Sequence, residues 1–239
     1  MPAQTAPEPG AVSTPGTSAA SPSLPTTSGS TDSPPAIQPA LLTGLPEAAE
    51  LLRSDAAAWR ELGPRWGLPL TGRDACTVAL QNRLQCYSTQ RMTLHGLRQL
   101  DRPGILNLHL PGQGPRRALV TGITPETVTL QVGGQRWQMP LTALANIWRG
   151  DYATLWRQPE GVRGRVTQGT RGVAGEWLAQ RLTELQGKGL IDADASTFSA
   201  RLAAFQRAQG IDADGAAGPM TFMQVNLAAG VEEPRLSKP

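Results

Sequence analysis

The chain has 239 residues, of which 39% are hydrophobic and 17% charged, and its formal net charge is +3. These fractions exclude a membrane bundle, a long coiled coil and a chain whose disorder is driven by charge. No stretch approaches the roughly 18 consecutive apolar residues of a membrane span, so we expect a soluble globular body of one or two domains.

Positive charge is concentrated in the second part of the chain. Four of the 19 acidic residues and none of the 22 basic ones precede Arg53, so residues 53–239 carry a formal charge of +7. A positive body favours an anionic partner such as a wall polymer or a lipid headgroup. The arginines are scattered and form no basic run, so we expect no nucleic-acid partner.

Residues 1–40 are rich in Pro, Ser, Thr, Ala and Gly, and the first 45 residues hold 9 of the 21 prolines. Such a segment buries too little surface to offset its ordering entropy, and we interpret it as a disordered linker. The N-terminus lacks the basic and apolar regions of a signal peptide. A linker needs something to be linked to, so we expect the chain to be a piece of a longer protein.

Residues 41–158 have the pattern of an α+β domain. Apolar spacing predicts one or two amphipathic helices within 41–66, and then a short helix after Asp74 with Cys76 in its first turn. Apolar residues then recur at every second position. This alternation predicts an antiparallel sheet of about four strands packed on these helices. The expected strands are 105–110, 117–122, 127–132 and 136–139, followed by a helical turn at 141–147 and a last strand at 152–156.

The remaining chain has a glycine-rich and arginine-rich stretch, 159–172, which we interpret as an inter-domain linker. Helical spacing then predicts three helices over 173–185, 196–209 and 221–228, with Gly210 just past the second of them. A small three-helix domain over 173–230 and a flexible tail over 231–239 follow from this pattern. About 60 residues is close to the lower limit for a domain that folds alone.

The residues between the second and third of these helices suit tight turns. Gly210 and Gly215 tolerate positive φ, and Asp214 can accept loop amides in an Asx turn. Thr221 can cap the third helix. Residues 173–228 resemble the three-helix peptidoglycan-binding module of many cell-wall hydrolases. The residues that match this module are Trp177, Leu178, Leu182, Phe205, Gln206, Arg207, Gly210, Asp214, Gly215, Gly218 and Thr221. The resemblance implies peptidoglycan as ligand, with the candidate binding residues Gln206, Arg207, Asp214 and Thr221.

Short phrases of the preceding part point to a second family. They are DAC at 74–76, AL at 79–80, LQC at 84–86, LDRP at 100–103, ALVTG at 118–122, WRG at 148–150 and LWR at 155–157. This part resembles the papain-like peptidases that process double-glycine leaders. The two parts in this order are similar to the periplasmic region of the general secretion pathway protein A (ExeA-like) family of type II secretion.

This second resemblance implies a periplasmic location as part of a protein anchored in the inner membrane, with an ATPase domain outside this chain. The implied partners are peptidoglycan and general secretion pathway protein B, with the secretin as a further candidate. No metal and no cofactor are expected, because the sequence has no Cys/His metal spacing.

Cys76 occupies the position of the peptidase nucleophile, which needs an imidazole as its base. The resemblance puts that histidine at Arg116 or Arg117, and an arginine cannot serve as a base near neutral pH. The expected oxyanion glutamine falls at Leu70. The only histidines are His95 and His109, and the latter lies out of phase with the apolar positions of its strand. We therefore expect a peptidase-like domain without catalysis.

Two cysteines in an oxidising periplasm can form a crosslink. On one unbroken helix Cys76 and Cys86 would lie about 15 Å apart, too far for a disulfide, but a chain reversal after residue 83 would allow closure. The favoured function is a binding module that helps to place or assemble the secretin. Two alternatives stay open: a cysteine peptidase or wall hydrolase targeted by the C-terminal module, and an interaction fragment that has lost its wall ligand.

Overall fold

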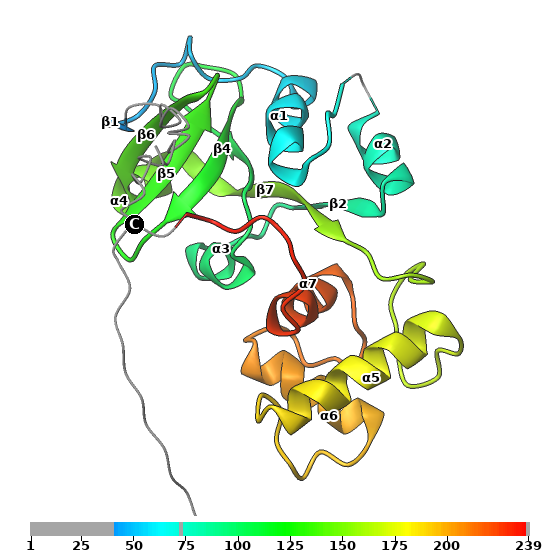
Figure 1. Cartoon of the computed structure of the whole chain (residues 1–239). Helices are drawn as coiled ribbons and strands as arrows, with labels where there is room; N and C mark the ends of the chain where they lie inside the picture. Colours follow the sequence, from blue (N-terminus) through cyan, green and yellow to red (C-terminus); the bar gives the residue numbers. More distant parts are fainter. Residues whose placement is uncertain (1–40, 72–73, 238–239) are drawn as a thin grey trace, which may run out of the picture. The chain divides into compact units, whose positions relative to one another are not determined.

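The computed structural model describes residues 41–71 and 74–237, so the expected linker over 1–40 lies outside the described residues. Within them, no helix has both the length and the apolar character needed to cross a membrane. The elements in chain order (Figure 1) are β1 (Leu41–Thr43), α1 (Asp55–Leu62), the 3₁₀ helix η1 (Gly63–Trp66), α2 (Ala75–Gln81), β2 (Leu84–Thr89), α3 (Leu94–Leu100), β3 (Gly104–Leu108), β4 (Arg116–Ile123), β5 (Thr127–Val132), β6 (Gln135–Pro140), α4 (Leu141–Ile147), β7 (Trp148–Arg157), α5 (Val173–Gly187), α6 (Phe198–Ala208) and α7 (Pro219–Ala228).

One seven-stranded sheet has the order β1-β6-β5-β4-β3-β7-β2. Of the described strand pairs, β1–β6 alone is parallel. The mixed α and β composition is as predicted, but β1 and β2 were not predicted, and residues 41–43 are strand where the pattern suggested helix. β1 has only three residues, and β2 follows α2 after a reversal at Arg83, whose φ is +59°.

The two faces of the sheet carry different apolar clusters because neighbouring strand residues point to opposite sides. Leu119 of β4 packs with α1 and α2, together with Ile105 and Leu155. Ala118 and Val120, on either side of Leu119, belong to the cluster on the other face. Helices α1 and α2 thus cover one face of the central strands.

The second cluster continues from the sheet into the three C-terminal helices. Leu178, Leu182 and Phe205 belong to the same contiguous set of buried side chains as Val120. Trp156 at the end of β7 stacks on Phe222 of α7 with ring centroids 5.9 Å apart. The sheet and the helices therefore share one core.

The expected linker over 159–172 is packed against the helices. Val162 and Val166 are buried. Val166 and Ala217 exchange two backbone hydrogen bonds of 3.0 and 2.8 Å, which attach this segment to the loop before α7.

A buried ion pair joins the sheet to the end of the chain. Arg102, just before β3, pairs with Glu233 after α7, and neither side chain has any exposed surface. The Arg102 guanidinium also donates to the carbonyls of Leu100 at 3.0 Å and Met223 at 2.9 Å. Burial lowers the pKa of Arg102 and the Glu233 carboxylate opposes that shift. An arginine keeps its charge in proteins, so this charge depends on Glu233 for compensation.

The second carboxylate oxygen of Glu233, Oε1, accepts hydrogen bonds from two more elements. It accepts from the backbone N–H of Arg157 at 2.8 Å and from the Asn226 side chain at 3.2 Å. The Tyr152 hydroxyl donates to the carbonyl of Arg102 at 2.9 Å. Strand β7, helix α7 and the segment before β3 therefore meet at one buried polar cluster.

The tail expected to be flexible over 231–239 is instead packed across its described part, 231–237. Leu236 is 4% exposed, and the Ser237 N–H donates to the Thr121 carbonyl of β4 at 2.8 Å. The interpretation as a tail was wrong for these residues because two of their contacts, Glu233 with Arg102 and Ser237 with Thr121, are to residues more than a hundred positions earlier. Local sequence patterns carry no trace of such contacts.

Replacing Glu233 by Gln should destabilise the protein by about 3 kcal/mol or more, because the nearly isosteric change leaves the Arg102 charge buried and uncompensated. Urea denaturation followed by circular dichroism measures this. Glu232→Gln is the matched control, since Glu232 is exposed and should change the free energy of unfolding by no more than about 0.5 kcal/mol. Equal denaturation midpoints for the two variants would contradict a structural role of the pair.

Candidate functional site

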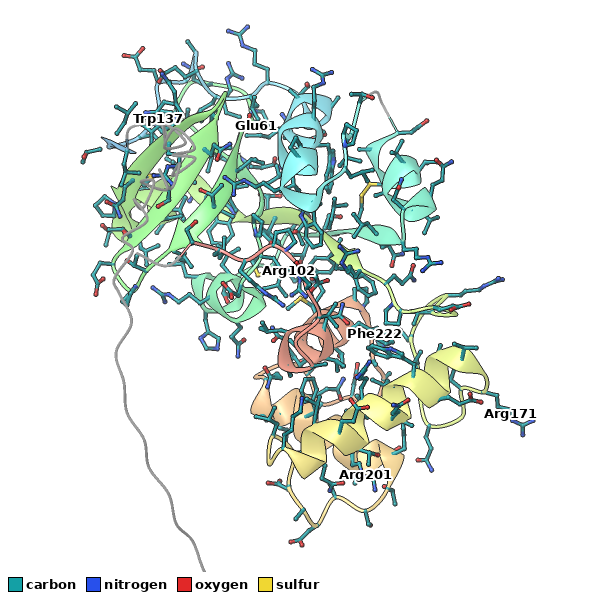
Figure 2. All side chains as sticks on the ribbon, in the orientation of Figure 1. Glu61, Arg102, Trp137, Arg171, Arg201 and Phe222 are labelled. Atoms are coloured by element: carbon teal, nitrogen blue, oxygen red, sulfur yellow. A yellow bond between two sulfur atoms is a disulfide. The ribbon has the colours of Figure 1, made fainter. Side chains whose placement is uncertain are left out.

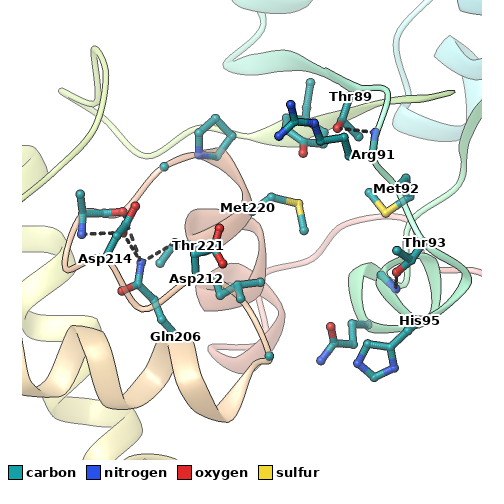
Figure 3. Close-up of a pocket in the computed structure, with 18 of the residues that line it drawn as sticks. Thr89, Arg91, Met92, Thr93, His95, Gln206, Asp212, Asp214, Met220 and Thr221 are labelled. Carbon is teal, nitrogen blue, oxygen red and sulfur yellow. Dashed lines mark hydrogen bonds between the residues drawn. The ribbon is translucent and has the colours of Figure 1, made fainter. Parts of the chain in front are cut away.

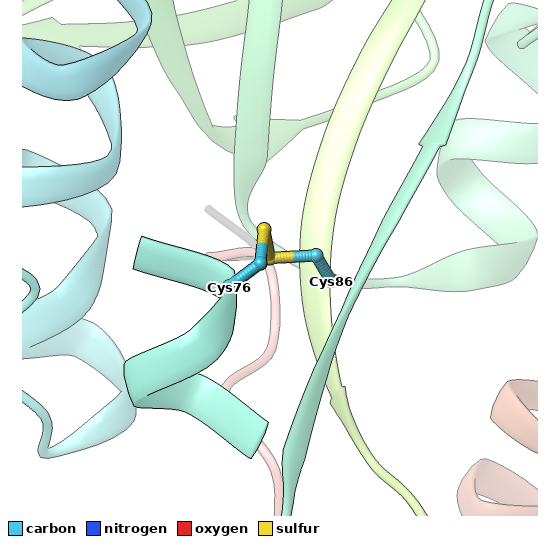
Figure 4. Close-up of a disulfide and its surroundings, with 2 residues drawn as sticks. All are labelled: Cys76 and Cys86. Atoms are coloured by element: carbon cyan, nitrogen blue, oxygen red, sulfur yellow. A yellow bond between two sulfur atoms is a disulfide. The ribbon is translucent and has the colours of Figure 1, made fainter. Parts of the chain in front are cut away.

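The two cysteines lie at the start of α2 and within β2. Helix α2 begins at Ala75, so Cys76 is in its first turn, as the sequence predicts. The chain reverses at Arg83, and Cys86 pairs with Leu155 of β7. Cys76 and Cys86 form a disulfide with a Cα–Cα distance of 5.5 Å (Figure 4). In this state no thiol is available at the nucleophile position.

A cavity of about 500 Å³ is lined in part by the two bonded cysteines. Its lining also includes Asp55, Trp59, Asn107 and Asp151. Arg117, at a position where the peptidase resemblance requires the histidine, donates from Nε to Asp55 at 2.5 Å. Leu70, at the oxyanion position, is a core residue with 1% exposure and no side-chain donor. Both positions therefore hold residues with structural contacts.

Neither histidine lines this cavity. His109 lies in the segment after β3 with its side chain 44% exposed, and its Nε2 is 3.1 Å from Asp151. Asp151 does line the cavity, so a histidine–carboxylate pair stands at its edge. His95 is on α3 and lines a different cavity. Over residues 41–71 and 74–237, no cluster of three or more His, Cys, Asp or Glu side chains is placed to hold a metal ion.

A second cavity, of about 520 Å³, lies where α3 and the segment before it approach the loop between α6 and α7 (Figure 3). Three of the four predicted ligand-binding residues, Gln206, Asp214 and Thr221, line it. Arg207 is exposed and is not part of the lining, because it is on a different face of α6 from the buried Gln206.

A hydrogen-bond network holds one wall of this cavity, and Gln206 is at its centre. Its Nε2 lies 3.2 Å from Asp214 Oδ1 and 3.3 Å from Thr221 Oγ1, and its Oε1 accepts from the Gly215 N–H at 3.2 Å. Gln206 and Thr221 are 1% and 3% exposed. These two buried residues support the wall through their hydrogen bonds. The Asp214 side chain is 42% exposed, so a ligand can reach it.

Two local predictions about this wall have different outcomes. Gly210 and Gly215 have φ of +60° and +68°, and the Ala216 N–H donates to Asp214 Oδ1 at 3.0 Å, so the turn chemistry is confirmed. Thr221 is not a helix cap. Helix α7 begins two residues earlier, with Gly218 as N-cap and Pro219 at its first position, which proline's fixed φ favours.

The opposite wall was not predicted. Arg91 and Met92 contribute to it from the loop between β2 and α3, and His95 contributes from α3. Thr93 caps α3 by accepting from the Gly96 N–H at 2.9 Å, and this was a readable signal for the helix. The sequence has no local signal that α3 faces α6, a contact made by Gln99 Nε2 donating to the Gln209 carbonyl at 2.8 Å.

The electrostatics of the first wall centre on Asp214. The Ala216 N–H and then the paired Arg165 guanidinium hold the pKa of its carboxyl below the usual value. A lowered pKa in the folded state stabilises the fold above the unfolded pKa, and this contribution is lost as the pH falls through the folded value. Asp214 is therefore anionic throughout the neutral range.

Residues 48–158 match the sequence model of the family described as "GspA, peptidase C39-like domain". General secretion pathway protein A of Aeromonas hydrophila is 29% identical over 185 residues, which cover 75% of this chain and 33% of that protein. The chain thus spans about a third of the length of this curated relative.

Among solved structures, the chain is similar to the periplasmic domain of the EpsAB fusion protein of the Vibrio vulnificus type II secretion system. The TM-score is 0.52 and the identity 26%, over 79% of this chain and 85% of the other. This coverage extends beyond residues 48–158. The peptidase domain of Streptococcus ComA, a bifunctional ABC transporter, is 16% identical over 42% of this chain and 76% of that chain, with a TM-score of 0.31.

The unreduced protein, unfolded in urea and treated with iodoacetamide, should gain no alkyl group, and the reduced protein should gain two. Intact-mass spectrometry measures this. The double variant Cys76→Ser, Cys86→Ser should lose about 2–3 kcal/mol of stability, because the bridge closes a short loop in the unfolded chain. Two alkylated thiols without reductant would rule the bridge out.

Arg165→Gln should raise the pKa of Asp214 towards its usual value without reaching it, because the Ala216 N–H still favours the carboxylate. Carbon-13 titration of the side-chain carboxyl measures this pKa. Arg163→Gln, an exposed change two residues away, should leave the titration unchanged. A titration that Arg165→Gln does not alter would contradict the role assigned to the ion pair.

Proposed function

We propose, from the match of residues 48–158 to the GspA peptidase C39-like domain family, that the chain is a non-catalytic periplasmic module of type II secretion that binds peptidoglycan. The observation that carries the proposal is the 520 Å³ cavity over Gln206, Asp214 and Thr221, which opens where the sequence resembles a wall-binding module. Its size is that of a small-ligand site.

The absence of catalysis is supported by three features of the peptidase-like part. Cys76 is bonded to Cys86 and offers no thiolate. Arg117 is paired with Asp55, and an arginine side chain cannot serve as a base near neutral pH. Leu70 has no donor for an oxyanion. An intact cysteine peptidase needs all three functions in one cleft.

Wall binding is supported by the chemistry of the second cavity. Its lining combines carboxylates, amides and hydroxyls with the apolar side chains of Met92, Ile211 and Met220. Sugars and peptides present the same mixture of polar and aliphatic groups. Residues 173–230 act in this proposal as the three-helix peptidoglycan-binding domain, with residues 41–158 as the peptidase-like domain.

The proposed partners come from the relatives. One similar structure is from a fusion protein named EpsAB, and its name supports general secretion pathway protein B as a partner of this chain. The proposed task is to hold the complex to the wall and so help to place or assemble the secretin. The proposed location is the periplasm, as part of a protein anchored in the inner membrane.

One observation favours the alternative of a cysteine peptidase. His109 and Asp151 form a pair at the edge of the cleft that contains Cys76. Two facts weigh against it: His109 is not in the lining of that cleft, and its Nε2 is already directed at Asp151. A base must reach the thiol proton within hydrogen-bond distance, directly or through one water.

Binding to purified sacculi, measured by co-sedimentation, tests the wall-binding function. The unaltered chain should sediment with the sacculi. Asp212→Trp should reduce the bound fraction several-fold. Asp212 is exposed and lines the cavity, so the tryptophan ring of the variant would fill the space that a ligand needs.

Two matched variants control this test. Ala213→Trp adds the same ring at the next residue, which is exposed but outside the lining, and Arg207→Ala removes a charge outside the lining. Both should sediment like the unaltered chain. A chain that stays in the supernatant would overturn wall binding, and equal sedimentation of all variants would move the site elsewhere.

A further inference from the structure

The second cavity is a composite of the two parts of the chain. One wall comes from 87–99, and the other comes from 206–221 together with Arg165. The walls touch at Gly210, where an added Cβ would come within 3.3 Å of Gln99 Nε2 and 3.8 Å of His95 Nε2. Since the parts also share a core and the Arg102–Glu233 pair, the distance between the walls is fixed by the fold.

The two walls carry opposite charges (Figure 3). Arg91 comes from the segment before α3, and Asp212 and Asp214 come from the loop before α7. Asp214 is already paired with Arg165. Within the described parts of the chain, the guanidinium of Arg91 and the carboxylate of Asp212 have no hydrogen bond or ion pair, and both residues are exposed. Each can take up a charged ligand group without giving up an existing contact.

Apolar side chains line the same cavity as these charges. Met92 is 7% exposed and packs in the core, and Met220 is half-buried beside it in the lining. Thioether side chains adapt to irregular aliphatic shapes. The cavity therefore offers a positive group, apolar side chains and a negative group.

We propose that this cavity binds a zwitterionic peptide, with its carboxylate on Arg91, its ammonium on Asp212 and its aliphatic part over Met92 and Met220. The proposal rests on the proposed wall-binding function and narrows it to the peptide stems of peptidoglycan, whose diamino acid carries both charges. Arginine suits the carboxylate because its planar fork can donate two parallel hydrogen bonds. The peptidase-like part thus contributes half of the ligand contacts.

Isothermal titration of the full chain with three probes tests the assignment. The first is acetyl-L-alanyl-γ-D-glutamyl-diaminopimelic acid. The second has the free amine acetylated, and the third has the diaminopimelate carboxyls amidated. The unaltered chain should bind the first about tenfold more tightly than either of the others, as expected for the loss of one hydrogen bond to a charged group.

Two exposed substitutions should remove these preferences selectively. Arg91→Gln should abolish the preference over the amidated peptide and keep that over the acetylated one, and Asp212→Asn should do the reverse. Arg60→Gln on α1, exposed and outside the cavity, should keep both preferences. Thermal melting confirms that each variant is folded.

The outcomes separate this proposal from the one it rests on. A chain that sediments with sacculi but binds all three peptides equally, or none, overturns the zwitterion site and leaves wall binding intact. Variants that keep both preferences also overturn the assignment of Arg91 and Asp212. A chain that binds neither sacculi nor peptide overturns both proposals.

Discussion

The arrangement of this protein depends on a buried charge that must be matched. Arg102 has no exposed surface, and its counterion, Glu233, lies 131 residues later in the chain. A buried guanidinium without its carboxylate is costly, so the fold is complete only when the C-terminal segment closes over β3 and β7. That closure positions α7 and the loop before it, and it thereby sets the wall of the second cavity that carries Asp214.

The disulfide and the shared core connect further elements to this pair; Figure 2 labels Arg102 and Phe222. Cys86 lies on β2, which pairs with β7 along six residues, and β7 delivers Trp156 onto Phe222 of α7. The bridge from Cys76 also fixes α2 to the same edge of the sheet. The position of a nucleophile in a peptidase-like fold is here used as a crosslink that supports the strand order.

Local patterns predicted what local physics determines. The three C-terminal helices, the αL turns at Gly210 and Gly215, and strands β4 to β7 follow from periodicity and turn chemistry, and they were found close to the predicted positions. Other features depend on contacts between residues that are distant in the sequence, and such contacts produce no periodic pattern. These features are the Arg102–Glu233 pair, the packed segment 231–237 and the cavity wall formed by residues 87–99. Sequence therefore indicated one wall of the candidate site and could not indicate the other.

The two cavities differ in the state of their charges, and this difference points to where ligand binding resides. In the cleft around the disulfide, Asp55 is paired with Arg117 and Asp151 is in hydrogen-bond contact with His109, so both carboxylates already have side-chain partners. In the cavity beside α7, Arg91 and Asp212 face the opening without such partners among the described residues. A ligand entering the first cleft would have to displace these contacts, whereas a charged ligand entering the second would supply the missing partners of Arg91 and Asp212. The cavity beside α7 is therefore better suited than the cleft around the disulfide to hold a charged ligand.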